Sequence, residues 1–570
     1  MKSIKGAILF LAVIAYTVGC QSKKTNLSPE LLSIDLLRGD ITLCGNPDFG
    51  ELSFSLACEL SSRETFDLAI SLLHSFEYAE AEKAFVKVID ADPECAMAYW
   101  GVAMSLYHSL WAPPGATELD KGYRLLQIAE TLPKSKRAAA YLNAINAFYN
   151  NWETVGHDTR QALYEKKMET IYMDQKEDSE AAIFYALALT ASADPTDRTY
   201  KKQREAGKIL ESLFRDQPNH PGIAHYIIHT YDYPEIAELG LATARRYAKI
   251  APSSAHAQHM PSHIFTRLGL WTESITTNIN SASSAVCYAQ GSGLEGNWAQ
   301  EIHAMDYLVY AYLQKGDNEK ANEQNDYLKS MKKVFPSTNF FAVAYTSNAI
   351  PARIALENKQ WSKAAKLERP QLEFDWQPFP WEQSILHFAR ALGFARLGEV
   401  ESAERELEII QGFHRELTGI NSAMASYMAA QVNVEIKTTQ AWIAFAKGNA
   451  EQALGLMNMA AVMESKTTKH PVTPGEVLPA YQLLGDMYSE LKDPSNAIRA
   501  YEADLANHPY RFNSIYGVAS AASKIGDDDK ALKYFEMLLT LTEGSSSDRV
   551  ELVEAREYVN MDKQVAELIR

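Results

Sequence analysis

Apolar and polar residues follow one another with the period of an α-helix over most of the chain, and runs with the two-residue alternation of a strand are nearly absent. Short turns centred on glycine separate the helical segments. In each turn an acid or an amide follows the glycine, which suits the end of one helix and the cap of the next. Four such turns lie at 315–317, 397–399, 447–449 and 525–527. The pattern predicts an all-α protein made of helix–turn–helix units.

A segment near the C-terminus indicates the length of the repeating unit. Its key residues fall at places 4, 7, 8, 11, 20, 24 and 32 of a 34-residue frame, and they are Tyr481, Leu484, Gly485, Tyr488, Ala497, Tyr501 and Pro509. Small residues at places 8 and 20 let two helices cross closely, aromatic residues fill the groove between them, and the proline stops the second helix. This set of places resembles the tetratricopeptide repeat.

Other segments repeat the same spacing. They are Ala69, Leu72, Ala81, Phe85 and Pro93; Leu308, Tyr312, Gly316 and Ala321; Ala391, Phe394, Gly398, Ala403 and Leu407; Ala441, Gly448 and Ala453; and Ala519, Ala531 and Phe535. The resemblance implies a right-handed superhelical solenoid whose first helices line a concave groove. A glycine-rich stretch at 289–297 interrupts the array, so we expect an N-terminal superhelix over residues 61–290 and a C-terminal one over residues 298–570. Prolines and tryptophans at 369–381 predict an irregular joint.

The first twenty residues predict the compartment. Lys2 and Lys5 precede an apolar stretch from Ala7 to Val18, which is too short to span a bilayer comfortably and fits the core of a secretory signal. Gly19 and Cys20 follow the stretch, and Cys20 resembles the lipidated cysteine of bacterial lipoproteins. The alternative is an ordinary cleaved signal followed by a coincidental cysteine.

The lipoprotein resemblance implies how the chain begins after processing. We expect a signal peptide over residues 1–19 and a tether with an N-terminal cap over residues 20–60. In many Gram-negative bacteria an aspartate after the lipidated cysteine marks retention in the inner membrane. Gln21 stands there instead, so the expected location is the outer membrane, with the lipid on Cys20 as the anchor.

The balance of charge excludes one class of partner. The chain has 72 acidic and 55 basic residues, a formal net charge of −17, and no basic stripe. Nucleic acid is therefore not an expected partner. No apolar run after the signal approaches the length of a membrane span.

The remaining cysteines suggest one cross-link. Cys44 and Cys58 flank a Gly-Asn-Pro turn region and are candidates for a local disulfide in an oxidising compartment. Cys95 and Cys287 lie on helical patterns, and we interpret them as buried free thiols. The chain has no Cys-x-x-Cys pair, so thiol redox chemistry and cysteine zinc sites have no support.

Six of the fourteen histidines lie between residues 220 and 263. Four of them form two pairs with the spacing i, i+4, which puts both rings of a pair on one face of a helix. The pairs are His225 with His229 and His259 with His263. The length of one full repeat separates each histidine of the first pair from its counterpart in the second.

The repeat frame places these rings. The pairs take places 5 and 9 of two successive units, and in tetratricopeptide proteins the places 2, 5, 9, 12 and 13 line the groove. The resemblance therefore implies that two neighbouring helices direct four imidazoles into the groove. His256 takes place 2, while His74 and His108 take place 13 of their own units. Asp232 follows closely after His229 and is a candidate to orient a ring from behind.

The cluster has two interpretations. In the first, His225, His229, His259 and His263 bind a metal, for which imidazole favours zinc, copper, iron or nickel. In the second, the rings are hydrogen-bond partners in the groove or pack between helices. A zinc-protease mechanism is excluded because Tyr226 stands where that motif needs a glutamate.

A loop at 469–476 has a related ambiguity. It contains several prolines and threonines, and it can drape over the groove and bring His470 and Glu476 to the histidine cluster. A plain linker between units fits its length equally well.

Some segments resemble a group of secreted bacterial tetratricopeptide proteins that has no established activity, so the resemblance supplies a fold without chemistry. They are Leu73–Phe76, Ala98–Gly101, His225–His229, His259–Phe265 and His470–Gly475. No Ser/His/Asp order or nucleophile elbow is present, which favours a protein that is not an enzyme.

The first hypothesis is a membrane-anchored scaffold that presents its concave groove to a protein or peptide partner. The second is a metal-binding protein or metalloenzyme that holds zinc or copper on the groove histidines. A third and weaker hypothesis is an accessory protein in the processing of surface glycans, which rests only on the anchor and the many aromatic residues.

Overall fold

A computed structural model describes residues 27–44, 48–52, 54, 62–110, 113–194, 197–335, 340–467, 472–545, 547 and 549–569 of the 570-residue chain. The predicted signal peptide, Cys20, Cys58 and His470 lie outside these residues. No described helix is long and apolar enough to cross a membrane.

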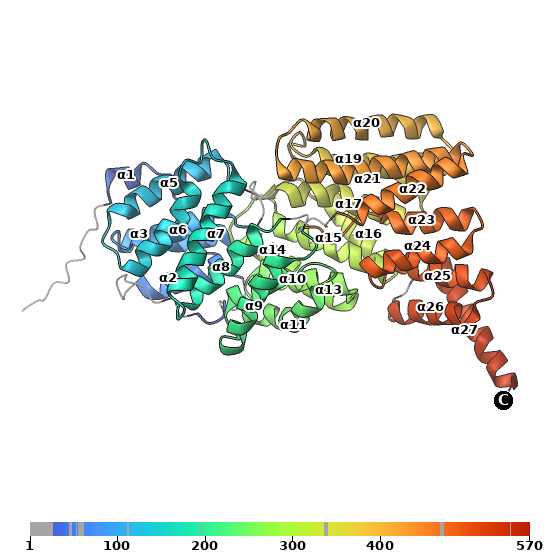
Figure 1. Ribbon diagram of the computed structural model, residues 1–570, viewed down its shortest axis with the longest axis horizontal. Coiled ribbons are helices and arrows are strands. Elements are labelled where there is room, and N and C mark those ends of the chain that lie inside the picture. The colour runs from blue at the N-terminus through green and yellow to red at the C-terminus, as the bar shows by residue number, and fades with distance from the viewer. Residues whose placement is uncertain are drawn as a thin grey trace, which may run out of the picture.

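The N-terminal half consists of helical hairpins that follow a short helix α1 (Pro29–Leu32) (Figure 1). They are α2 (Arg63–His74) with α3 (Tyr78–Ala91), α4 (Ala96–Tyr107) with α5 (Ala116–Thr131), α6 (Lys136–Tyr149) with α7 (His157–Asp174), α8 (Ser179–Ala191) with α9 (Lys201–Asp216), and α10 (Pro221–Tyr231) with α11 (Leu241–Ile250), which the 3-10 turn Ala237–Gly240 introduces. Two short helices, α12 (Ala255–His259) and α13 (Pro261–Leu268), together pair with the long α14 (Trp271–Gly291).

The C-terminal half continues the array. Its hairpins are α15 (Ala299–Gln314) with α16 (Asn318–Ser330), α17 (Phe340–Glu357) with α18 (Trp361–Ala364), α19 (Pro380–Arg396) with α20 (Val400–Thr418), α21 (Ala423–Ala446) with α22 (Ala450–Glu464), α23 (Ala480–Glu490) with α24 (Pro494–Asn507), and α25 (Phe512–Lys524) with α26 (Asp528–Leu541), followed by α27 (Val550–Ile569). In the described chain the strands are very short, β1 (Asn297–Trp298) and β2 (Val334–Phe335), paired in parallel. The prediction of an all-α helical repeat fold is confirmed.

The residues of the repeat signature hold neighbouring helices together. A Cβ on Gly485 would lie 2.5 Å from the ring of Tyr501, and a Cβ on Gly517 would lie at the same distance from its other side. Tyr501 of α24 therefore packs against the first helices of two successive units, as the spacing predicts. The predicted turn glycines also have positive φ angles of 70° to 82°, which end the first helix of each hairpin; they are Gly316, Gly398, Gly448 and Gly526.

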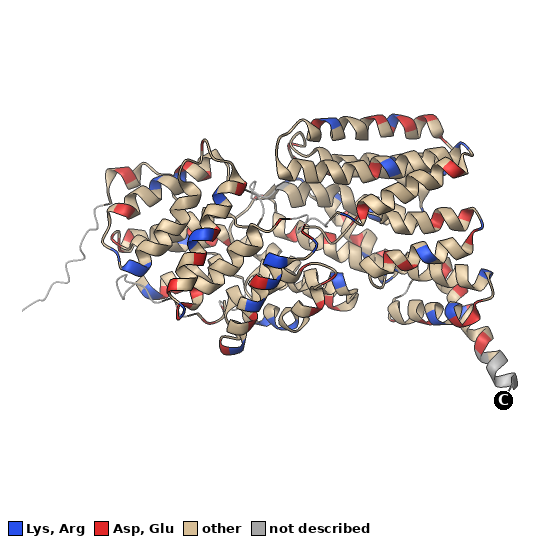
Figure 2. Cartoon of the chain, viewed as in Figure 1, with Lys and Arg blue, Asp and Glu red and all other residues tan. Residues whose placement is uncertain are grey.

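The two predicted superhelices are joined without a gap in packing. One apolar core runs from Leu31 to Phe265, and another runs from Ala299 to Leu372. Between them α14 packs along α15, and β1 precedes α15 directly. Figure 2 shows acidic and basic residues intermixed along the outer helices, without a basic face in that view.

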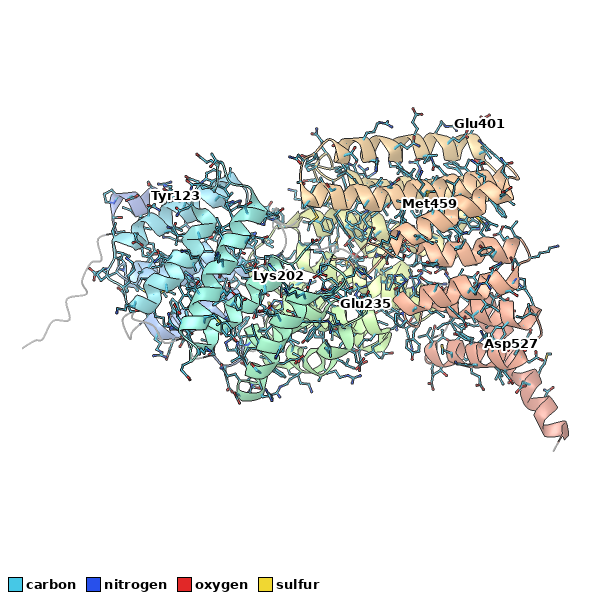
Figure 3. All side chains as sticks on the ribbon, in the orientation of Figure 1. Tyr123, Lys202, Glu235, Glu401, Met459 and Asp527 are labelled. Atoms are coloured by element: carbon cyan, nitrogen blue, oxygen red, sulfur yellow. A yellow bond between two sulfur atoms is a disulfide. The ribbon has the colours of Figure 1, made fainter. Side chains whose placement is uncertain are left out.

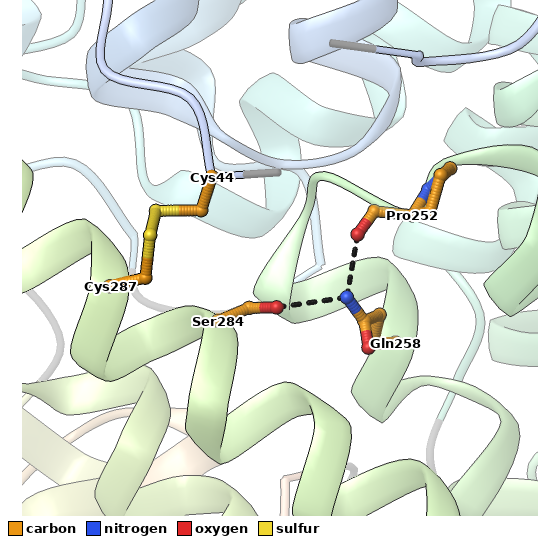
Figure 4. The surroundings of a disulfide bond; sticks show 5 residues. All are labelled: Cys44, Pro252, Gln258, Ser284 and Cys287. Carbon is orange, nitrogen blue, oxygen red and sulfur yellow. Dashed lines mark hydrogen bonds between the residues drawn. A yellow bond between two sulfur atoms is a disulfide. The ribbon is translucent and has the colours of Figure 1, made fainter. Parts of the chain in front are cut away.

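The disulfide of Cys44 differs from the prediction. Cys44 is bonded to Cys287 of α14 and not to Cys58 (Figure 4). Residues 34–44 cross the N-terminal half as an extended strap, and the carboxylate of Glu80 accepts hydrogen bonds from the strap at Thr42 and from α14 at Tyr288. The strap therefore carries Cys44 to a partner 243 residues away.

The interpretation of two cysteines as free thiols is wrong. Cys287 forms the bond with Cys44, and Cys95 is disulfide-bonded as well. Helical patterns around a cysteine predict its burial, but they do not reveal which distant segment the fold brings against it.

Loss of the bond between strap and α14 should destabilise the protein. We expect Cys287→Ser to lower the free energy of unfolding by about 2–5 kcal/mol, because the bond closes a very long loop. Urea unfolding followed by circular dichroism measures the loss. Cys44→Ser and the double variant should give the same value, since each removes the same bond. Ser284→Ala, one turn earlier on α14, is the control and should cost under about 1.5 kcal/mol. A double variant whose loss of unfolding free energy equals the sum of the two single losses would contradict this expectation.

Two carboxyls, the buried Glu382 and the half-buried Glu435, make the C-terminal half sensitive to pH. Glu382 of α19 is 1% exposed, and Glu435 of α21 accepts a hydrogen bond from the Ser384 hydroxyl at 2.5 Å. Burial raises the pKa of each carboxyl to about 8, and in Glu435 the neighbouring Glu382 adds to the rise. Both groups are therefore protonated in the folded protein at neutral pH.

Stability should consequently fall with rising pH. Because the folded-state pKa lies above the ordinary 4.5, the stabilising effect is complete below about pH 4.5 and is lost as the pH rises through about 8. Glu382→Gln should flatten this dependence by a few kcal/mol between pH 5 and 9, measured by urea unfolding at each pH. Glu401→Gln, on the exposed face of α20 (Figure 3), is the matched control and should leave the slope unchanged. An unchanged slope in Glu382→Gln would refute the assignment.

Candidate metal centre

The helix α10 brings His225 and His229 together in a buried setting. Pro221 stands at its first position, where a missing N–H costs no hydrogen bond, and Nδ1 of His220 caps the helix by accepting the N–H of Ile223. Every residue of α10 is buried. As the i, i+4 spacing predicts, the two rings share a face, and their Nε2 atoms are 2.9 Å apart.

A proline divides the helix that carries the second pair. α12 ends at His259 and α13 begins at Pro261, which has no N–H for the preceding turn. Met260 between them keeps helical angles, with φ −52° and ψ −38°. His259 and His263 therefore still face one side, with their Nε2 atoms 3.0 Å apart.

Each pair gains a third histidine. His256 of α12 places its Nε2 3.1 Å from Nε2 of His225. His303 of α15 places its ring 4.2 Å from that of His259, measured between centroids. In each set of three, one ligand atom from every ring lies within 4.8 Å of the others. We call His225, His229 and His256 the first triad, and His259, His263 and His303 the second triad. All six side chains are at most 9% exposed.

His303 is the member that the sequence prediction missed. It lies farther beyond His263 than the length of one repeat, so the spacing that links the two pairs does not reach it. Its position relative to the turn glycine of its own repeat unit could have identified it. His303 precedes the turn glycine Gly316 by the same interval by which His256 precedes Gly269. Both histidines therefore occupy place 2 of their units.

In three of the rings, Nδ1, the nitrogen that points away from the triad, donates a hydrogen bond to a neighbouring residue. Nδ1 of His225 donates to the backbone carbonyl of His74 at 2.6 Å, and Nδ1 of His259 donates to Oδ1 of Asn278 at 2.6 Å. The amide of Asn278 is oriented by its own donation to the Ser274 carbonyl. These bonds place the proton on Nδ1, so Nε2 of each ring is unprotonated and points toward the other rings of its triad.

Asp232 holds the third of these rings, which is that of His263. Its Oδ2 accepts a hydrogen bond from Nδ1 of His263 at 2.8 Å, and its Oδ1 pairs with Nε of Arg267 at 3.1 Å. Both Asp232 and Arg267 are 4% exposed. The ion pair fixes the carboxylate and largely cancels its charge.

The predicted groove is filled at this place by the chain itself. The ring of Phe76, which follows α2, lies 4.4 Å from that of His225 and 5.6 Å from that of His229. On the other side Tyr307 of α15 lies 4.7 Å from the ring of His259. These contacts bury the triads, because the array curves until α10 packs against α2.

Burial keeps the first triad neutral. Desolvation lowers the pKa of His225 to about 3, and it lowers the pKa of His229 and of His256 well below the ordinary range. Neighbouring imidazoles act in the same direction. Neutral imidazole is the form that binds a metal ion.

A third group, His74 with Glu180 and His220, is a closed hydrogen-bonded network. The Glu180 carboxylate accepts from Nε2 of both histidines, at 3.0 and 2.9 Å. Nδ1 of His74 is 2.9 Å from the hydroxyl of Tyr226, and Nδ1 of His220 caps α10. Burial opposes ionisation of Glu180, yet the two imidazoles hold its pKa well below its usual value. This network buttresses the His74 carbonyl that orients His225.

The other predicted groove residues do not join the triads. His108 ends α4 with a left-handed φ of 46°, is partly exposed, and contacts the ring of Tyr78. Glu476 pairs with His508 at 2.8 Å. The loop before Glu476 is instead linked to the second triad through Arg267. This side chain donates hydrogen bonds to the carbonyls of Thr473 and Pro474.

Comparisons with known proteins agree with the repeat. Residues 478–503, which span α23 and most of α24, match the family model described as tetratricopeptide repeat. This match confirms the repeat predicted for that segment. No curated protein matches the chain.

Three solved structures illustrate the level of similarity. A chain of the APC/C hetero-tetramer Cut9-Hcn1 is 12% identical over 89% of this chain and 77% of its own, with a TM-score of 0.31. Human IFIT1, a dimer with m7Gppp-AAAA, is 14% identical over 90% and 98%, with a TM-score of 0.33. Yeast Tom70 is 12% identical over 88% and 96%, with a TM-score of 0.33. Similarity this low assigns no function to the chain.

The bond behind His259 can be tested by itself. We expect Asn278→Leu to lower the free energy of unfolding of the metal-free protein by about 1–3 kcal/mol, because it leaves a buried imidazole N–H without an acceptor. Urea unfolding measures the change. Asn458→Leu is a matched control, since this exposed residue makes the same bond to the carbonyl one helical turn earlier. Equal effects in the two variants would argue against the oriented ring.

Proposed function

We propose that this chain is a lipid-anchored metalloprotein of the cell envelope, in which each histidine triad holds one transition-metal ion. One observation carries the proposal. His259 and His263 both donate through Nδ1, to Asn278 and Asp232, and their Nε2 atoms face each other at 3.0 Å. Two unprotonated nitrogens that face each other at this distance are suited to hold a metal ion between them.

In the alternative of a hydrogen-bonded cluster, a proton lies between these nitrogens. A proton there creates an imidazolium in a site where His259 is 0% and His263 2% exposed. Such a charge is expensive to bury. Asp232 offers little compensation, because Arg267 already pairs with it. A metal ion satisfies both nitrogens and uses the third ring of the triad as well.

The donor set favours particular metals. Each triad consists of imidazoles alone, without a thiolate or a carboxylate, which suits copper or zinc and disfavours magnesium and calcium. Three protein ligands also leave a coordination position open, as in catalytic rather than structural sites. We therefore propose copper or zinc as the bound metal, with the open position available to a small ligand.

Two features support the envelope location. The disulfide between Cys44 and Cys287 suits an oxidising compartment, where such bonds persist. The basic start, the apolar stretch and Cys20 in the first twenty residues suit export and lipidation. We propose the outer membrane as the site of the anchor.

A protein partner is the second function, and we propose it for the C-terminal repeats. The match of residues 478–503 to the tetratricopeptide model supports it, because stacked repeats of this kind offer extended surfaces to partners. The face that carries the triads is covered by Phe76 and Tyr307, so a partner peptide has no room there.

Metal counting tests the metalloprotein. The full-length chain, stripped with a chelator and reloaded with cuprous or zinc ions, should hold two ions after desalting, measured by mass spectrometry of the elements. His225→Ala and His259→Ala should each lose one ion, and the double variant should lose both. His414→Ala, in α20 of the other half, is the control and should keep two. A wild-type protein that retains neither metal after reloading would overturn the proposal.

A further inference from the structure

We infer that the two triads act together as one dinuclear copper centre that binds dioxygen between its ions. This inference rests on the proposed function, and it names the metal and the ligand of the same site. Three observations support it: the closeness of the triads, the all-imidazole donor set, and the enclosure of the triads by aromatic rings.

The nearest rings of the two triads are about as far apart as the farthest rings within one triad. The ring centroids of His229 and His263 are 5.9 Å apart, and those of His256 and His259 are 6.4 Å apart. Within a triad the corresponding distances reach 6.0 Å for His229 and His256, and 6.2 Å for His263 and His303. Two bound ions would therefore be neighbours in one compartment, within reach of a shared ligand.

The charge of the site selects the metal. All six donors are imidazoles, which bind a metal ion in their neutral form, and the carboxylate that bonds a ring, Asp232, is paired with Arg267. The cost of burying an ion rises with the square of its charge, so two cuprous ions cost far less here than two zinc ions. Three imidazoles around each ion suit cuprous copper, which accepts a low coordination number.

Dioxygen fits the same charge balance. When it binds between two cuprous ions, each copper gives up one electron and becomes cupric, and the dioxygen takes both electrons and becomes a bound peroxide. The two new bonds are between copper and oxygen, the bond between the oxygens persists at lower order, and no proton moves. Two cupric ions with one peroxide carry the same total charge as two cuprous ions. The buried site therefore gains no net charge in the step.

The enclosure sets the size of the ligand. Phe76 covers the first triad, the ring of Tyr247 stacks on that of His225 at 5.3 Å, and Tyr307 covers the second triad. These rings exclude a large ligand from the triads. The hydroxyl of Tyr307 lies 3.3 Å from Nδ1 of His263, and burial raises its pKa well above 10.

Reaction with dioxygen tests the inference. The full-length protein is loaded without air with two cuprous ions and then exposed to dioxygen. We expect uptake of one dioxygen for two coppers, a new intense band in the near ultraviolet, and no electron paramagnetic resonance of copper, because the two cupric spins are coupled through the bridge.

Variants that break one triad provide the comparison. His303→Ala and His256→Gln should hold one copper, take up at least about tenfold less dioxygen, and show the resonance of an isolated cupric ion after oxidation. His414→Ala should behave as the wild type. His256→Gln keeps a polar side chain of similar length. If His303→Ala fails to fold, His256→Gln still tests the inference.

The outcomes separate this inference from the proposed function. Wild-type protein that holds two ions but takes up no dioxygen, or that shows two uncoupled cupric signals, would overturn the dinuclear centre and leave the metalloprotein intact. Binding of zinc without copper would do the same. A chain that holds no metal at all would overturn both.

Discussion

The structure of the buried centre depends on a single constraint, the fixed direction of the imidazole rings. Asn278 holds Nδ1 of His259 and Asp232 holds Nδ1 of His263, so that both Nε2 atoms are turned toward each other. Asn278 lies in α14, whereas Asp232 follows α10, so the two acceptors belong to different hairpins. The packing of α14 is therefore a condition for the centre, and the disulfide that ties Cys287 of α14 to the N-terminal strap reinforces it.

The repeat phase predicted more of this site than the residue types did. Hairpins, turn glycines and the two histidine pairs followed from a 34-residue frame, because a solenoid repeats its geometry whenever it repeats its spacing. His303 escaped because α14 and the segment after it lengthen one unit. Its place within its own repeat unit, place 2, identifies it, whereas its distance from His263 does not. What the frame cannot predict is contact between distant units, such as Phe76 on His225 or Cys44 on Cys287.

The same frame explains why the centre has two parts. The first triad takes places 5 and 9 of one unit and place 2 of the next, and the second triad repeats this choice one unit later. A third copy would need histidines at places 5 and 9 of the unit that contains α15. Asp306 and Tyr310 stand there, and they bond to Arg353 and Arg511. The array of histidines therefore ends at a buried ionic network.

This ionic network also helps to explain how a repeat scaffold can hold a buried polar centre. Arg353 donates to the carbonyl of Gly475, and Arg267 donates to those of Thr473 and Pro474, so one loop from the C-terminal half is fixed beside the second triad. Buried charges add little stability by themselves, but they allow few alternative arrangements. In a solenoid, where each unit contacts mainly its neighbours, such long-range bonds fix the curvature. The curvature in turn brings α2 and α15 over the histidines and removes water from them.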